Sequence, residues 1–307
     1  IAAVLGGLGR AASDAVAVVR GAVPGVVRFF SGVGARIGSA TRGMWDGIWN
    51  AFRGVINTLI RGWNSLKFTV PSIDLGPLGT KTSSAQITDL YEPGSTMKPF
   101  VVGLALETGR VKPSTPIQTA PGKITITGST ISDAHPHGVL TVNEVIQKSS
   151  NVGTVKIAMQ MPPQAMWEMF TQVGLGQRPQ VPFPGAVAGK LRAPNTWRPI
   201  EQATMSYGYG LSTSLFQLTH AYTMFARDGV MLPVTLIKHA TNESVSGPRV
   251  IEARHANAVR SMLFTVTQPG GTAQKAQTVG YTTGGKTGTA HKAEGKGYGH
   301  KYRGFFV

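Results

Sequence analysis

The sequence contains no cysteine, which excludes disulfide bonds, thiolate catalysis and cysteine-based zinc sites. Long apolar runs are also missing: no stretch reaches about 18 uncharged apolar residues, so we expect no transmembrane helix. The first residues, IAAVLGGLGRAASDAV, lack a basic segment followed by an apolar core, which argues against a signal peptide. Because the chain does not begin with Met, we expect a piece of a longer protein, with any export signal lying outside it.

Acidic residues are scarce, with 14 Asp and Glu against 30 Lys and Arg, so the formal net charge is +16. This excess fits an acidic partner such as nucleic acid, an anionic membrane or a cell-wall polymer. The cations are spread along the chain without a long Lys/Arg run, so we interpret them as a general basic bias and expect no nucleic-acid partner. Charged residues make up only 14% and apolar residues 41%, which excludes a disordered chain.

Residues 1–79 form the first of two unlike parts and are rich in Gly, Ala, Val and Arg. Within 44–66, MWDGIWNAFRGVINTLIRGWNSL, aromatic and aliphatic residues recur every three or four positions, which predicts a basic amphipathic helix. Such a helix packs on a partner helix or its own core, or lies on a membrane; we favour packing and keep membrane contact as the alternative. This part resembles the Trp-bearing segments of phage tail tape-measure proteins, which are structural elements.

The composition changes near Thr80–Ser84, and residues 80–307 are expected to form a second domain. A helix is expected from Ser95 as N-cap to Gly109, and another from Thr141, which forms a capping box with Glu144. Further helices are expected at 162–176, closed by Gly174, at 211–229 and at 252–267, and a strand at 278–292. Helices in the middle followed by late strands favour an α+β fold.

Three short motifs could carry chemistry: Ser95-Thr96-Met97-Lys98, Ser149-Ser150-Asn151 and Lys286-Thr287-Gly288-Thr289. A serine becomes a nucleophile when a neutral amine or another base lies beside it, and a three-residue step on a helix provides that proximity. Each motif alone also has a structural interpretation: a capped helix with an early lysine, a local Ser–Asn cap, and a strand edge with a solvated lysine. Jointly, in this order, they indicate acyl transfer.

These motifs resemble those of the penicillin-recognising acyl-transfer enzymes. ITDLYEPGSTMKPFVVGLAL, VIQKSSNVGTVKIAM, SYGYGLSTSLFQL and GGKTGTA are similar to the transpeptidase domain of class B penicillin-binding proteins, closest to the septal, cell-division peptidoglycan D,D-transpeptidase. The resemblance runs over about 87–307. It implies a penicillin-binding/β-lactamase-like fold, peptidoglycan stem peptides as substrates, β-lactams as inhibitors and proteins of the divisome or of cell-wall synthesis as partners. It also implies a place in the cell envelope, at the periplasmic face of the inner membrane.

The resemblance implies a role for each motif residue. Ser95 would attack the penultimate D-alanine carbonyl, and Lys98 would take its proton. Ser149 would relay a proton to the departing D-alanine, and Asn151 would hold the substrate amide. The remaining roles fall on the third motif. Lys286 and Thr287 would bind the terminal carboxylate or help orient Ser149, and Gly288 would allow close approach of the substrate backbone. The amides of Thr289 and Ser95 would hold the oxyanion.

The family pattern is incomplete at both ends. In the family, two strands precede the Ser-x-x-Lys helix, whereas residues 1–79 occupy that place here, and the chain stops at KYRGFFV, in the strand after Lys-Thr-Gly. We therefore expect a truncated sheet reduced to one hairpin, and a fragmentary or chimeric product whose transpeptidase activity is impaired or lost. The rival hypothesis is a phage-type structural or membrane-interacting protein that carries an inactive transpeptidase fragment.

Two other enzymatic interpretations have little support. A β-lactamase needs a glutamate to activate the deacylating water, and no acid between the second and third motifs lies in a Glu-x-x-x-Asn setting: Glu168, Glu201, Asp228, Glu243 and Glu252. A metal site would rest on His135-Pro136-His137, which we interpret as a proline-bent loop with exposed imidazoles. We therefore expect transfer to an amine, with no metal and no cofactor.

Overall fold

The computed structural model describes residues 85–181, 185–235, 245–294 and 297–307, together with positions 17, 20, 21 and 23–25. The chain divides into two compact units, Ile1–Ala85 and Gln86–Val307. The expected helix over 44–66 and the boundary between 79 and 80 lie outside the described residues and stay predictions. In the described part of the chain, no helix combines the length and the apolar character needed to cross a membrane.

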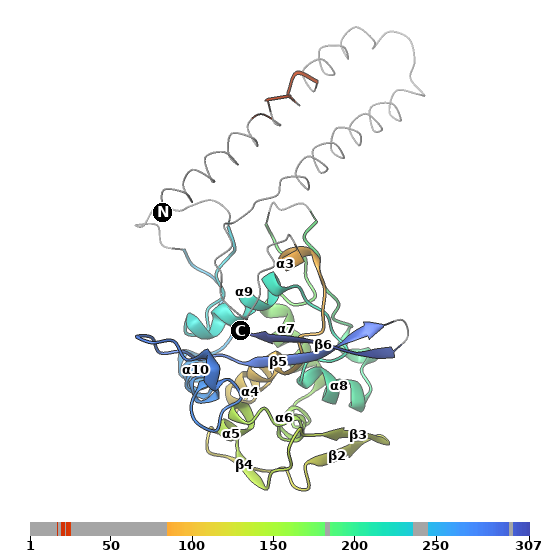
Figure 1. Ribbon diagram of the computed structural model, residues 1–307, viewed down its shortest axis with the longest axis vertical. Helices are drawn as coiled ribbons and strands as arrows, with labels where there is room; N and C mark the ends of the chain where they lie inside the picture. Colours follow the sequence, from red (N-terminus) through yellow and green to blue (C-terminus); the bar gives the residue numbers. More distant parts are fainter. Residues whose placement is uncertain are drawn as a thin grey trace. The chain divides into compact units, whose positions relative to one another are not determined.

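The second unit is mixed helix and strand, as the sequence predicts (Figure 1). Its helical elements are α3 (Ala85–Thr88), η2 (Gly94–Met97), α4 (Lys98–Glu107), α5 (Val142–Gln147), α6 (Asn151–Ala158), α7 (Pro163–Gln172), η3 (Pro194–Thr196), α8 (Pro199–Ser206), α9 (Leu215–Ala226), α10 (Ala253–Thr267) and η4 (Gln274–Ala276). Its strands are β1 (Pro116–Gln118), β2 (Lys123–Ile126), β3 (Ser129–Ser132), β4 (Val139–Thr141), β5 (Thr287–Glu294) and β6 (Gly297–Phe306). Helices α6 and α8 were not expected as separate elements.

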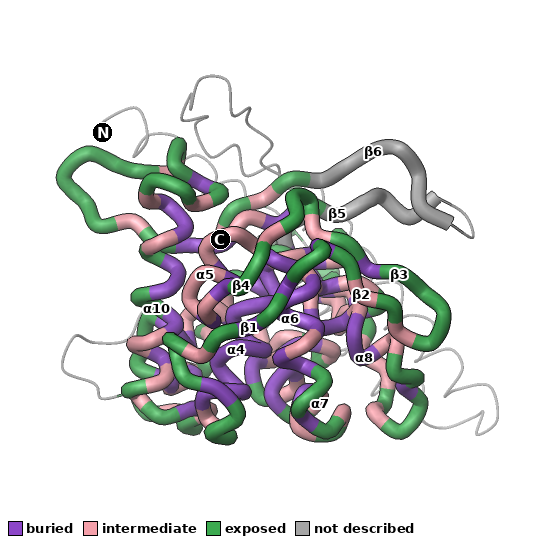
Figure 2. Tube along the Cα trace, turned by 90° about the horizontal axis from the view of Figure 1, so that it is seen from below, coloured by how far each residue is buried: buried purple, intermediate pink, exposed green. Residues whose placement is uncertain are grey.

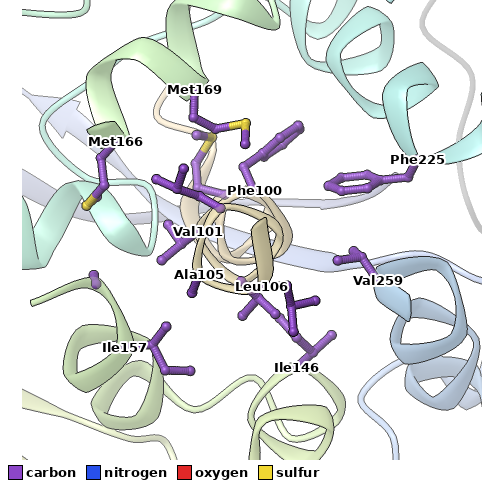
Figure 3. Close-up of a cluster of buried hydrophobic side chains, with 14 of the residues drawn as sticks. Phe100, Val101, Ala105, Leu106, Ile146, Ile157, Met166, Met169, Phe225 and Val259 are labelled. Atoms are coloured by element: carbon purple, nitrogen blue, oxygen red, sulfur yellow. The ribbon is translucent and has the colours of Figure 1, made fainter. Parts of the chain in front are cut away.

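Helix α4 forms the centre of the core, since nine of its ten residues are buried on all sides. A helix that is apolar all round must be covered by neighbours, and α5, α6, α7 and α10 pack against it. Figure 3 shows Phe100 and Leu106 of α4 among side chains from these helices and from α9. In Figure 2, buried residues gather along α4 and α6, whereas β2 and β3 are largely exposed. The start of α4 is therefore held rigidly by the core.

The helix ends follow local sequence signals in most places. The capping box of Thr141 and Glu144 is formed, and Gly109 and Gly174 follow their helices with positive φ angles of 67° and 88°. The expected N-cap at Ser95 is wrong: Ser95 lies inside the 3-10 turn η2, and α4 begins at Lys98 without a side-chain cap. Pro99 explains the break, because it has no N–H to bond to the Ser95 carbonyl, which accepts the Lys98 N–H instead.

Strands of the described residues form three two-stranded antiparallel sheets, β1–β4, β2–β3 and β5–β6. The β5–β6 hairpin is the one expected from the truncated family sheet, with Thr289 opposite Gly304. The expected strand over 278–292 begins too early, since β5 starts at Thr287. Upstream of Lys286, the Gly285 N–H bonds to the Leu263 carbonyl of α10 and so leaves the strand ladder.

Candidate functional site

The first motif lies at the junction of η2 and α4, at the start of the buried helix of the second unit (Figure 1). Ser95 is partly exposed, whereas Lys98 is 0% exposed. Hydrogen bonds hold the residues before and after Ser95. The Gly94 N–H donates to the Gly208 carbonyl at 3.1 Å, and the Thr96 hydroxyl donates to the Pro93 carbonyl at 2.7 Å. The other residues of the η2 turn are thus buried, and the Ser95 side chain is the part of the turn that stays partly exposed.

The second motif forms the connection between α5 and α6. Ser149 has a positive φ of 58°, a conformation that non-glycine residues adopt rarely and that occurs at functional turns. Ser150 is the N-cap of α6, and its hydroxyl accepts the Gly153 N–H at 2.9 Å. The predicted Ser–Asn cap is therefore real, but Ser150 provides it, which leaves Ser149 and Asn151 free to face Lys98.

The third motif brings the start of β5 against η2. Lys286 exchanges backbone hydrogen bonds with Val307 at 2.8 and 3.2 Å, and its side chain is 0% exposed. A Cβ on Gly288 would lie 2.9 Å from the Pro93 carbonyl, and one on Gly94 would lie 2.9 Å from the Thr289 carbonyl. Glycine at these two positions lets the backbone of the nucleophile turn contact the strand directly.

The motifs meet at the hydroxyl of Ser149. Lys98 Nζ donates to the Ser149 carbonyl at 2.5 Å, to Ser149 Oγ at 3.1 Å and to Asn151 Oδ1 at 2.8 Å. Lys286 Nζ donates to the same Ser149 Oγ at 2.8 Å. One hydroxyl therefore links two buried amines that come from chain segments far apart in the sequence.

Burial controls the protonation of both lysines. It lowers the pKa of Lys98 well below the ordinary lysine value; the positive charge of Lys286 lowers it further, and Asp133 acts in the opposite direction. Burial also lowers the pKa of Lys286 to about 7. An amine with such a pKa can be neutral near physiological pH, which a general base requires.

The replacement Lys286→Met is expected to raise the free energy of unfolding by about 1–2 kcal/mol at pH 7, because it removes a buried amine. With its pKa lowered to about 7, Lys286 binds fewer protons in the folded than in the unfolded state up to pH ~10. Wild-type stability should therefore rise with pH through this window, and the rise should be shallower in Lys286→Met, with Lys98 providing the remainder.

Urea unfolding at several pH values between 6 and 10 measures this effect. The exposed Lys275, replaced by Met, is the matched control and should keep the wild-type pH dependence. An unchanged slope in Lys286→Met would show that the buried amine does not titrate as proposed.

The structure unites most of the motif residues but differs from expectation in one contact. Lys98 was expected to act as the base for Ser95; in the described residues the hydrogen bonds of the Lys98 side chain go to Ser149 and Asn151. Thr287 bonds through its hydroxyl to the Thr272 hydroxyl at 2.9 Å.

Sequence reasoning missed the residue that orients the second motif. Asp133, after β3, accepts hydrogen bonds from the Ser150 hydroxyl at 2.7 Å, the Asn151 N–H at 2.5 Å and the Val152 N–H at 2.9 Å. A carboxylate at the N-terminus of α6 satisfies donors that the helix leaves unpaired. The Asn151 amide group also donates to the Ser132 carbonyl at 2.8 Å. No sequence pattern could pair Asp133 with α6, because a turn and two other elements separate them in the chain.

The histidines of His135-Pro136-His137 do not belong to this site. His135 is exposed and His137 is partly exposed. Within the described residues, no group of three or more His, Cys, Asp or Glu side chains is arranged to hold a metal ion.

The chain is similar to penicillin-binding proteins by sequence and by structure. The family model for the penicillin-binding protein transpeptidase domain matches residues 65–307, beginning upstream of the position near 87 expected from the motifs. A probable peptidoglycan D,D-transpeptidase PenA of Neisseria flavescens is 43% identical over 222 residues, which is 72% of this chain and 54% of that protein. The peptidoglycan D,D-transpeptidase FtsI of Escherichia coli K12 is 38% identical over 217 residues, which is 70% of this chain and 36% of that protein.

Among solved structures, the apo transpeptidase domain of Burkholderia pseudomallei penicillin-binding protein 3 is 54% identical and has a TM-score of 0.71. The similarity covers 72% of this chain and 67% of that one. The chain spans from about a third to about a half of the length of the curated relatives named above.

Proposed function

Because this chain belongs to the penicillin-binding protein transpeptidase family, we propose that it is a serine-type D,D-transpeptidase that acts through an acyl-enzyme on Ser95. The observation that carries this proposal is the contact of both buried amines, Lys98 and Lys286, with the Ser149 hydroxyl. Burial lowers the pKa of amines, and a hydroxyl that contacts two amines can pass a proton between them. These are the parts that serine acyl transfer requires beyond the nucleophile.

In the proposed acylation, Ser95 Oγ attacks the carbonyl of the penultimate D-alanine of a stem peptide. The neutral Lys98 amine takes the hydroxyl proton, the Oγ–C bond forms and the C–N bond to the terminal D-alanine breaks. Ser149, which is bonded to Lys98, delivers a proton to the departing amine. Asn151 holds Lys98 through its Oδ1, in addition to binding the substrate amide.

The third motif would bind the substrate along the β5 edge. Lys286 and the Thr287 hydroxyl suit the terminal carboxylate, and Gly288 leaves room for substrate backbone. The N–H groups of Ser95 and Thr289 would hold the oxyanion, a contact worth about 3–4 kcal/mol. The close approach of η2 to β5 at Gly94 supports this pairing of amides from two segments.

The acyl-enzyme would be resolved by the amine of a neighbouring stem peptide, which cross-links the cell wall. A β-lactam would acylate Ser95 in place of the substrate. The corresponding place is the cell envelope, where the relatives' substrate peptidoglycan lies, with proteins of the divisome or of cell-wall synthesis as partners. The competing hypothesis of a phage-type structural protein with an inactive transpeptidase fragment rests on residues 1–79, most of which lie outside the described residues, and none of the described contacts favours it.

Incubation of the purified chain with a fluorescent penicillin tests the proposal. We expect a covalent adduct of one penicillin per chain, located by peptide mass spectrometry on Ser95 and blocked by unlabelled penicillin. A donor peptide ending in D-Ala-D-Ala should then release D-alanine and yield a cross-linked product with an acceptor amine. The absence of any adduct on Ser95 would refute the proposal and support the expectation that truncation abolishes activity.

A further inference from the structure

The residue after the nucleophile, Thr96, accepts a hydrogen bond from a helix that is distant in the sequence. Tyr222 of α9 donates its hydroxyl to the Thr96 carbonyl at 2.7 Å. Thr96 stands next to Ser95 in η2, and its side chain bonds back to Pro93. The Tyr222 hydroxyl therefore contacts the backbone of the nucleophile turn without touching Ser95.

The Tyr222 ring is held in place by other aromatic rings. It packs edge-on against Phe100 of α4, with centroids 5.2 Å apart, and against Phe225, one turn further along α9, with centroids 5.7 Å apart. Edge-to-face geometry is a favoured arrangement of aromatic pairs. Burial raises the pKa of Tyr222 well above the ordinary tyrosine value, so the hydroxyl keeps its proton and stays a donor.

The η2 turn depends on hydrogen bonds with other elements because it makes few hydrogen bonds of its own. It has four residues, no side-chain cap at either helix start, and Pro99 removes one backbone donor from the first turn of α4. On the side before Ser95, the Gly94 N–H is bonded to Gly208, and a Cβ on Gly208 would lie 2.0 Å from the Gly94 carbonyl. After Ser95, the turn is bonded to another element through the hydrogen bond that the Tyr222 hydroxyl donates to the Thr96 carbonyl.

We propose that Tyr222 is a positioning residue, whose hydroxyl fixes the carbonyl of Thr96, the residue after Ser95, and so holds the nucleophile in its reactive orientation. The inference rests on the proposed acylation of Ser95. Two hydrogen bonds hold the backbone of the turn, one with Gly208 at the residue before the serine and one with Tyr222 at the residue after it. Loss of the Tyr222 hydrogen bond leaves the turn folded but lets Ser95 sample unreactive orientations. This lowers the rate at which Ser95 is acylated more than it lowers the affinity for the acylating ligand.

The variant Tyr222→Phe tests this, since it keeps the ring contacts and removes the hydroxyl. In stopped-flow acylation with a penicillin, the first-order acylation constant should fall roughly tenfold, while the dissociation constant of the preceding non-covalent complex stays within about twofold of wild type. Hydrogen exchange of the amides between 94 and 98 should become faster, with the rest of the unit unchanged. Thr223→Val, on the same helix, removes a hydroxyl bonded to the His220 carbonyl and should change neither quantity.

The outcomes separate the two proposals. If wild type forms no adduct, the proposed function fails, and hydrogen exchange alone decides whether Tyr222 holds the turn. Unchanged exchange between 94 and 98 in Tyr222→Phe would overturn the inference, as would an unchanged acylation constant in a reactive protein. Faster exchange throughout the unit would also overturn it, because it would show a general structural role.

Discussion

The variant Ser95→Ala should form no covalent adduct with penicillin, with the acylation rate reduced by at least about 10⁴-fold. Alanine has no hydroxyl to form the acyl bond, and Ser95 is the serine of the η2 turn, immediately before α4 and the buried Lys98. The fold should tolerate the change. The Ser95 hydroxyl makes no hydrogen bond to another described residue, and its side chain is partly exposed, so the midpoint of thermal unfolding should stay near the wild-type value.

Gel fluorescence and intact-protein mass, recorded over a time course, measure this result. Ser114→Ala removes an exposed serine from the same unit and should label at the wild-type rate. Labelling of Ser95→Ala at the wild-type rate would assign the nucleophile to another residue. Loss of labelling accompanied by unfolding would leave the role of Ser95 to be decided by Ser95→Cys, which retains a nucleophile of similar size.

The second large effect is expected for Lys98→Met, in which acylation should fall by about 10³-fold, the usual contribution of a general base. Methionine matches the length and burial of the lysine but accepts no proton. The free energy of unfolding should change less than the acylation barrier does, because the loss of the hydrogen bonds to Ser149 and Asn151 is offset by the removal of a buried amine.

Lys98→Arg distinguishes a base from a positive charge. A guanidinium stays protonated, so arginine should not restore the acylation rate if Lys98 acts as the base. The wild-type rate should rise with pH as Lys98 loses its proton and should become flat in Lys98→Met. Lys112→Met, at an exposed position, is the matched control. Full activity of Lys98→Arg would contradict the proposed proton transfer.

The sequence could predict the local elements because their causes are local. The capping box of Thr141 and Glu144 and the glycines at 109 and 174 act over three or four residues, and each helix is found where they indicate it. The start of β5 and the cap of α4 were predicted wrongly. The first depends on where Gly285 bonds to α10, and the second on Pro99, whose missing donor changes the geometry of the preceding turn.

The candidate site divides in the same way. The order and spacing of the three motifs identified the chemical groups, because a serine, two amines and an amide are properties of residue types. Their contacts required the tertiary structure. The bonds of Lys98 to the second motif, rather than to Ser95, follow from how α6 packs on α4.

The α+β character of residues 80–307, the family and the residues that could carry acyl transfer were all predictable from the sequence. The packing was needed to show that Lys98 and Lys286 are fully buried and share one hydroxyl, that Asp133 caps α6, and that Tyr222 bonds to the turn of the nucleophile. Values of pKa and side-chain orientations depend on desolvation and on partners from distant segments, and these arise only when the chain has packed.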